Sequence, residues 1–131
     1  MKTILVDAVD TSIIENESGE FVKFQEMFDL LETYENQKII LTNANDEQIK
    51  EFGLDDVPYP VFTLKHNPDK PNPIYFESLL TEYDFSPEEV IYFEHNPSAV
   101  ESAESIGIIS YFYDPELKDL DALKSFLDEN L

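Results

Sequence analysis

The sequence contains no cysteine and no arginine. Without cysteine, the chain can form neither disulfide bonds nor zinc sites with thiolate ligands. It also lacks any apolar run approaching the roughly 18 residues that a membrane-spanning helix needs. The N-terminus carries one lysine and few apolar residues, unlike a signal peptide. These absences favour a soluble, cytoplasmic protein that does not enter a membrane.

Negative charge dominates the sequence, because 8 lysines and 29 acidic residues give a formal net charge of −21. Such a field repels nucleic acid phosphates and anionic membranes, so we expect neither as a partner. It also makes a phosphorylated substrate harder to recruit unless a cation or local donors intervene. Two interpretations of the charge stay open: a solvated acidic surface, or a docking surface for a basic partner.

The composition is that of a folded domain. Hydrophobic residues make up 42% of the 131 residues and aromatic residues 13%, which is enough to build a core and too much for a disordered chain. No linker, internal repeat or low-complexity segment interrupts the sequence. We therefore expect a single domain over residues 1–131.

Strand-like and helix-like segments alternate along the chain, which predicts βαβ units and a parallel sheet. The apolar runs predicted to be strands are 2–7, 38–42, 59–64, 89–93 and 108–113. Apolar residues with helical spacing lie between or after these runs. The three helical faces comprise Phe24, Met27, Phe28 and Leu31; Phe76, Leu79, Leu80 and Tyr83; and Leu117, Leu120, Leu123 and Leu127.

Capping signals mark two of the predicted helices. Asn45 is placed to cap a helix over 46–52, and Gly53 stands just past its end. Pro97 begins a second helix, which Gly107 closes. Both helices follow predicted strands, as the alternation requires.

Two shorter segments also carry local signals. Residues 86–89 (Ser-Pro-Glu-Glu) predict a single capped turn just before a strand. Residues 12–22 predict a β-hairpin with its turn at 16–19, because Asn and Gly in this stretch favour a tight turn. The hairpin is expected to act as a flap beside the end of the first strand.

A carboxylate ends the first apolar run, where residues 4–6 (Ile-Leu-Val) lead into Asp7. The carboxyl end of a buried parallel strand is where ligands bind in open α/β sheets. With Thr11 four residues on, the stretch resembles the first motif of the haloacid dehalogenase (HAD) superfamily, Asp-x-Asp-x-Thr. Val9 stands where the second aspartate of that motif belongs.

Three further stretches resemble HAD motifs, in the family's order. Residues 39–43 form an apolar run ending in a hydroxyl residue, and residues 69–76 resemble the family's Lys-Pro-x-Pro-x-x-Phe. Residues 89–107 follow the strand, loop and helix of the fourth motif through to its closing glycine. The resemblance thus covers residues 4–107, most of the chain.

The resemblance implies a three-layer α/β sandwich with a Rossmann-like parallel sheet of about five strands. Larger members of the family carry a cap domain after the first or second motif. Here 34 residues separate Asp7 from Thr42 (positions 8–41) and 27 separate Thr42 from Lys70 (positions 43–69), so we expect no cap. In the family, capless members often act on macromolecules or form oligomers, and the sequence does not choose between these.

The chemistry of the family implies a role for each matching position. An aspartate attacks phosphorus and forms an aspartyl-phosphate, and a second aspartate serves as general acid and base. A hydroxyl and a lysine ammonium bind the phosphoryl oxygens. Asp7 matches the nucleophile, while Thr42 and Lys70 match the two phosphate-binding catalytic residues. Asn43, beside Thr42, is a further predicted phosphate-binding residue.

Two parts of the family's site are altered. Val9 has no proton to give, so the usual general acid and base is absent. The family's fourth motif reads Gly-Asp-x-x-x-Asp, whereas this chain has Glu94, His95 and Ala99 at those three positions. The resemblance implies Mg²⁺, for which the candidate ligands are Asp7, the Val9 carbonyl, Glu94 and His95. The loss of a carboxylate from the fourth motif should weaken Mg²⁺ binding, since Mg²⁺ prefers hard oxygen ligands.

Substitutes for the missing groups lie nearby. Adjacent side chains on an extended segment point to opposite faces, so Asp10 should point away from Asp7 unless a tight turn brings it back. His95 is a candidate transition-metal ligand or acid/base near neutral pH, and alternatively a loop histidine with local hydrogen bonds. For His66 we expect an ordinary loop position. Lys70 has a simpler alternative role as the counterion of Asp7.

Three functional hypotheses follow. The first is a HAD-like protein with a degenerate site, of low or no phosphatase activity, that binds a phosphorylated small molecule or protein partner. The second is an active metal-dependent phosphatase that uses Asp7 as nucleophile with a rearranged acid/base and metal site. The third is an acidic interaction module in which the site plays no part. The oligomeric state is left open.

Overall fold

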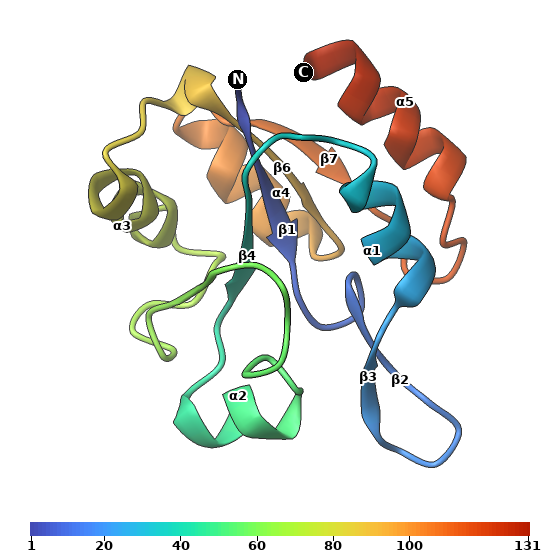
Figure 1. Cartoon of the computed structure of the whole chain (residues 1–131). Coiled ribbons are helices and arrows are strands. Elements are labelled where there is room, and N and C mark those ends of the chain that lie inside the picture. Colours follow the sequence, from blue (N-terminus) through green and yellow to red (C-terminus); the bar gives the residue numbers. More distant parts are fainter.

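A five-stranded parallel sheet forms the centre of the computed structural model, which describes all of residues 1–131 (Figure 1). Its strands are β1 (Thr3–Asp7), β4 (Lys38–Thr42), β5 (Val61–Thr63), β6 (Val90–Glu94) and β7 (Ile109–Phe112), in the order β5-β4-β1-β6-β7. Each strand overlaps a predicted apolar run, although β6 extends one residue past the run 89–93 and β5 uses only three residues of the run 59–64. The predicted parallel sheet is therefore confirmed.

Helices cover both faces of this sheet and make three layers (Figure 1). One face carries α1 (Gln25–Glu32) and α5 (Leu120–Asn130), and the other carries α3 (Ile74–Tyr83) and α4 (Pro97–Ser105). The short α2 (Asp46–Glu51) and a 3₁₀ turn (Pro87–Glu89) complete the helical elements. The three-layer sandwich is confirmed, and the intervals after β1 and β4 hold no cap domain.

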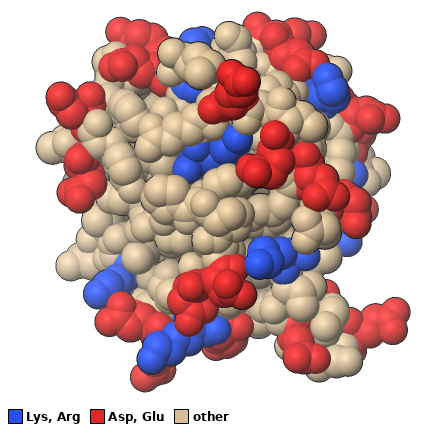
Figure 2. Space-filling view, viewed as in Figure 1, with Lys and Arg blue, Asp and Glu red and all other residues tan.

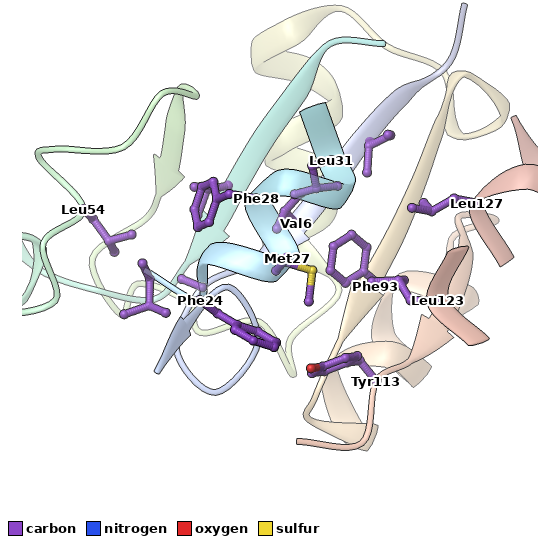
Figure 3. Close-up of a cluster of buried hydrophobic side chains, with 14 of the residues drawn as sticks. Val6, Phe24, Met27, Phe28, Leu31, Leu54, Phe93, Tyr113, Leu123 and Leu127 are labelled. Carbon is purple, nitrogen blue, oxygen red and sulfur yellow. The ribbon is translucent and has the colours of Figure 1, made fainter. Parts of the chain in front are cut away.

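Successive side chains of the central strand enter opposite layers of the core. Val6 lies with Met27 of α1 and Phe93 of β6 in the cluster under α1 and α5 (Figure 3). Leu5 lies in the other cluster, with Phe76 of α3. Strands β1, β4 and β6 are buried along their whole length, which explains their continuous apolar runs.

Polar caps set the helices that follow β4 and β6. Asn45 accepts a hydrogen bond from the Gln48 N–H at 2.9 Å, and the Gln48 side chain accepts one from the Asn45 N–H at 3.0 Å. This reciprocal pair is a capping box, and Gly53 after the helix takes a φ of +70°. Asn96 caps α4 by accepting a bond from the Ser98 N–H at 3.0 Å. The loops at the carboxyl edge of the sheet are thereby held in place.

A hairpin of β2 (Ile13–Glu15) and β3 (Phe21–Lys23) connects β1 to α1. Asn16 closes its turn by accepting two backbone N–H bonds, at 3.0 and 2.9 Å. In Figure 1 the hairpin and α2 both extend past the carboxyl edge of the sheet. The rings of Phe21 and Phe52 meet edge to face, with centroids 4.7 Å apart, and join the two elements.

Leu117 does not join the apolar face of the last helix, contrary to the prediction. Asp119 caps α5 by accepting a bond from a first-turn N–H at 3.0 Å, and Lys118 before it has a positive φ of 47°. The helix cannot extend back through these residues, so Leu117 is 73% exposed. Leu123 and Leu127, inside the helix, are fully buried.

The distribution of charge on the surface agrees with the acidic composition of the sequence. Acidic side chains are spread over the face shown in Figure 2, with lysines scattered among them. The net charge of −21 is therefore not gathered into one patch on that face. No helix is both long and apolar enough to cross a membrane.

Candidate functional site

The carboxyl ends of β1, β4 and β6 meet around a cavity of about 160 Å³. The chain runs from β1 to β4 and β5, then returns to the other side of β1 to add β6 and β7. Strand order thus reverses at β1, where open α/β sheets bind their ligands. The cavity lining includes every predicted site residue, namely Asp7, Val9, Thr42, Asn43, Lys70, Glu94 and His95.

Asp7 is buried, and both of its carboxylate oxygens are engaged. Oδ1 accepts a bond from the Lys70 ammonium. Oδ2 accepts bonds from the Thr11 hydroxyl at 2.7 Å, the His95 ring Nδ1 at 2.5 Å and the His95 N–H at 3.3 Å. Burial alone would raise the pKa of Asp7, but the Lys70 charge and the His95 hydrogen bond outweigh it and hold that pKa well below its usual range. Asp7 is therefore a fully ionised carboxylate.

Lys70 joins the two buried carboxylates of the site. Its ammonium pairs with Asp7 and, at 2.8 Å, with Glu94 Oε1, and it also donates to the Leu41 carbonyl at 3.3 Å. The Lys70 N–H donates to the Asn43 side chain at 2.8 Å, so Asn43 positions the lysine. Burial alone would lower the pKa of Lys70, but the two carboxylates raise it above its ordinary value.

Glu94 is completely buried below Lys70. Besides the lysine, its carboxylate accepts bonds from the Tyr92 hydroxyl and, at 3.1 Å, from the Asn96 N–H. Its Oε2 also lies 3.1 Å from the His95 ring. Residues 92 and 94 share one face of β6, since side chains alternate along a strand. The glutamate that replaces the family's glycine is thus held by hydrogen bonds at both of its side-chain oxygens.

His95 bridges the buried carboxylates and the cavity mouth. Its Nδ1 contacts Asp7 and Glu94, while its Nε2 lies 3.7 Å from Asp10 Oδ2. The hydrogen bonds to Asp7 and Glu94 raise the pKa of His95 to about 10, so the ring is protonated at neutral pH. With Lys70 it balances the charges of the two buried carboxylates.

Asp10 does not point away from the site, although side-chain alternation along an extended chain would direct it away from Asp7. The chain turns sharply after Ala8, whose carbonyl accepts bonds from the N–H groups of Thr11, Ser12 and Ile13. Asp10 has a positive φ of 69° in this turn, which brings its carboxylate to the outer side of the His95 ring. The tight turn overrides the alternation of an extended strand.

Several donors in the cavity wall have no partner within the protein. The N–H groups of Val9 and Asn43 make no intramolecular hydrogen bond. The Thr42 hydroxyl oxygen accepts a bond from the Ala44 N–H at 3.2 Å, which leaves its proton free. Unpaired N–H and O–H donors around one small cavity can bind an anion.

Some residues that support the site were not predicted to do so. Thr11 belongs to the first motif, but only the fold shows that its hydroxyl holds Asp7. Tyr75 fixes the end of β4 by donating to the Thr42 carbonyl at 2.8 Å. His66, expected in an ordinary loop, lines the cavity and bonds to Gln48 at 2.6 Å. Neither tyrosine, Tyr75 or Tyr92, could be separated by sequence from ordinary core aromatics.

The family's magnesium is a poor match for these residues. Donor atoms of Asp7, Glu94 and His95 lie within 4.8 Å of one another and form the one cluster able to hold a metal. One of the three donors is an imidazole nitrogen rather than an oxygen. Mg²⁺ requires hard oxygen ligands in octahedral geometry, and Ala99 offers none where the motif has its second aspartate. The site as built does not fit Mg²⁺.

Replacing Lys70 by methionine should lower the free energy of unfolding by about 3–5 kcal/mol, because it leaves two buried carboxylates without their cation. Urea unfolding followed by circular dichroism measures the change. The matched control is Lys124→Met, which removes an exposed ion pair to Asp128 and should change stability little. Equal effects of the two substitutions would contradict the central role of Lys70.

Replacing His95 by glutamine should flatten the pH dependence of stability between pH 6.5 and about 10. The pKa of His95 rises from 6.5 to about 10 on folding, so its stabilisation is complete below pH 6.5 and is lost as the pH rises to about 10. Urea unfolding at a series of pH values, with a chelator present, measures the slope. His66→Gln should keep the wild-type slope, and an unchanged slope in His95→Gln would refute the assignment.

Comparisons with known proteins agree with this architecture. A family model described as haloacid dehalogenase-like hydrolase matches residues 1–112. Among curated proteins, none matches the sequence. Among solved structures, the D,D-heptose 1.7-bisphosphate phosphatase from B. bronchiseptica, complexed with magnesium and phosphate, is 13% identical with a TM-score of 0.74 over 100% of both chains.

Two further structures share the fold. A HAD-family enzyme from Bacteroides thetaiotaomicron, complexed with magnesium and inorganic phosphate, is 13% identical, with a TM-score of 0.67 over 88% of this chain and 95% of that one. A HAD-superfamily hydrolase from Ehrlichia chaffeensis is 20% identical, with a TM-score of 0.65 over 83% of this chain and 59% of that one. Such identities show the fold alone, whereas the family match covers most of the sequence. The chain therefore belongs to the haloacid dehalogenase-like hydrolase family.

Proposed function

We propose that this protein binds a phosphoryl group, on a small molecule or a protein, and turns it over slowly or not at all. One observation carries the proposal: both oxygens of Asp7 are held by Lys70, Thr11 and His95, and Val9 replaces the acid/base that would assist attack. The nucleophile of the family is present but fully hydrogen-bonded.

Two features argue against efficient hydrolysis. General acid and base assistance is worth about 10²–10⁴ in rate, and Val9 supplies none. The Asp7 carboxylate is also stabilised as an anion, since the Lys70 charge and the His95 hydrogen bond hold its pKa below the usual range against the opposing effect of burial. A carboxylate stabilised in this way is a weaker nucleophile, because attack must give up those bonds.

The cavity retains features suited to an anion. The free N–H groups of Val9 and Asn43 and the Thr42 hydroxyl surround it, and Lys70 supplies a positive charge. Its volume of about 160 Å³ is below the roughly 300–1,000 Å³ of pockets for drug-sized ligands, so it suits one phosphoryl-sized group. Two solved structures of similar fold contain phosphate, which is consistent with this ligand class.

The net charge of the chain limits which phosphorylated ligands the cavity can bind. The charges of Asp7 and Glu94 are balanced by those of Lys70 and protonated His95. The site therefore has little net charge of its own with which to offset the net charge of −21 of the whole chain. A polyanionic ligand would be repelled. A single phosphoryl group, or one carried by a basic protein segment, fits this field best.

A second candidate, an active phosphatase, is favoured by the position of His95. Its ring contacts Asp7 on one side and faces Asp10 at 3.7 Å on the other, at the mouth of the cavity. A histidine held this way is placed to exchange protons with solvent and so to replace the acid/base lost at Val9. The two candidates differ in whether Asp7 supports turnover.

A panel of phosphate esters, assayed with Mg²⁺, Mn²⁺ and Co²⁺, separates the two candidates. We expect any turnover to be low and equal in the wild type and in Asp7→Asn, while calorimetry detects binding of inorganic phosphate or of a panel member. Asn is nearly the same size as Asp, which makes the variant a suitable control. Clear turnover that Asp7→Asn abolishes would favour the active phosphatase and reject our proposal.

Restoring the altered motif positions should create activity. The double variant Val9→Asp, His95→Asp regains the missing acid/base and an oxygen ligand in place of imidazole. We expect Mg²⁺-dependent phosphatase activity at least about 10²-fold above the wild type, from the acid/base term alone. The single variant His95→Asp is the control, and a folded double variant without activity would show that other features silence the site.

A further inference from the structure

We propose that Asp7, Glu94 and His95 form a binding site for a divalent transition-metal ion of the Zn²⁺ and Co²⁺ class, which they select over Mg²⁺. The ligand atoms are Asp7 Oδ2, Glu94 Oε2 and His95 Nδ1. This inference goes beyond the proposed binding of a phosphoryl group and does not depend on it.

The two carboxylates divide their oxygens between two cations. Lys70 takes Oδ1 of Asp7 and Oε1 of Glu94. The remaining oxygens, Oδ2 and Oε2, converge on His95 Nδ1 at 2.5 and 3.1 Å. A position bounded by two carboxylate oxygens and a ring nitrogen is thus already assembled, with Lys70 on its far side.

The spacing of these atoms suits a single small ion. Zinc binds nitrogen and oxygen ligands at about 2.0–2.2 Å, so two ligands of one ion lie roughly 3 Å apart. One ligand atom from each of the three residues lies within 4.8 Å of the other two, and the two contacts to Nδ1, at 2.5 and 3.1 Å, lie on either side of that separation. To admit the ion, His95 must give up its Nδ1 proton, and its partly exposed ring must move away from Asp7 Oδ2, since 2.5 Å is shorter than the separation of two zinc ligands.

The donor types decide which ion is preferred. Imidazole suits Zn²⁺, Co²⁺, Ni²⁺ and Cu²⁺, whereas Mg²⁺ takes oxygen ligands. Three protein ligands also leave at least one coordination position open, as in catalytic zinc sites. Because the cluster lines the cavity, a water molecule or a bound anion can occupy that position.

The surroundings of the three ligands are those of a supported metal site. Asp10 Oδ2 lies 3.7 Å from His95 Nε2, on the opposite side of the ring from the ligand atom. At 3.7 Å the carboxylate is too far away for a direct hydrogen bond, but its charge favours a proton on Nε2 and so leaves Nδ1 to the metal. Thr11 holds Asp7 Oδ2 at 2.7 Å, and the Asn96 N–H holds Glu94 Oε2 at 3.1 Å. Asp10 thus acts as a positioning residue.

Calorimetric titration of the untagged full-length chain with Zn²⁺, and separately with Mg²⁺, tests the proposal. We expect one Zn²⁺ per chain and no Mg²⁺ binding at the same concentration. His95→Ala removes the imidazole ligand and should weaken Zn²⁺ binding by more than about 100-fold, since even outer partners of metal ligands account for about 10–100-fold. His95→Asp supplies an oxygen ligand in its place and should admit Mg²⁺. The matched control is His66→Gln, which removes the other histidine and should leave Zn²⁺ binding unchanged.

Two further measurements test the proposal even if a His95 variant does not fold. Asp10→Asn changes an exposed side chain and should weaken Zn²⁺ binding by about 2–5-fold, as expected for loss of an exposed ion pair, without loss of the fold. Co²⁺ should give visible absorption bands that His95→Asp shifts and His66→Gln preserves. Equal affinity for Zn²⁺ and Mg²⁺, or Zn²⁺ binding that is unchanged in His95→Ala, would overturn the proposal. Phosphate binding measured with a chelator present is a separate result, so the two proposals can fail independently.

Discussion

The buried ion pair of Lys70 with Asp7 and Glu94 is the interaction on which the site depends. Its three charged groups come from the end of β1, the loop before α3 and the end of β6, and all are nearly inaccessible to water. Two carboxylates at this depth are tolerated only because a cation lies between them. The ammonium therefore sets the positions of three segments far apart in the sequence, and with them the shape of the cavity.

His95 completes this arrangement and distinguishes the site from the family's fourth motif. In the family's fourth motif an aspartate holds this position, and here an imidazole contacts both buried carboxylates. The exchange removes an oxygen ligand and introduces a nitrogen, and with Val9 it also removes the usual proton donor. In our proposals, changes at these two positions affect catalysis and metal preference together, while the unpaired donors of the cavity wall are retained.

Much of the fold could be predicted from sequence, because it rests on local patterns. Apolar runs located all five strands of the sheet, and Asn45, Pro97 and the glycines that follow located two helices. The prediction was wrong for Leu117, where a cap at Asp119 begins the helix later than the apolar spacing suggests. The supporting roles of Tyr75, Tyr92 and Thr11 also could not be predicted from the sequence, since each acts through a hydrogen bond within the folded site.

The sequence by itself determined the order of strands and helices, the carboxylate at the end of β1 and the loss of the usual acid at Val9. These are statements about residue type and spacing, which no tertiary contact can alter. Only the tertiary structure decided that Lys70 pairs with both carboxylates, that His95 contacts both, and that a tight turn brings Asp10 to the outer side of the His95 ring. Those facts depend on side chains from separate strands meeting at one edge of the sheet, where burial and charge balance determine which groups are paired.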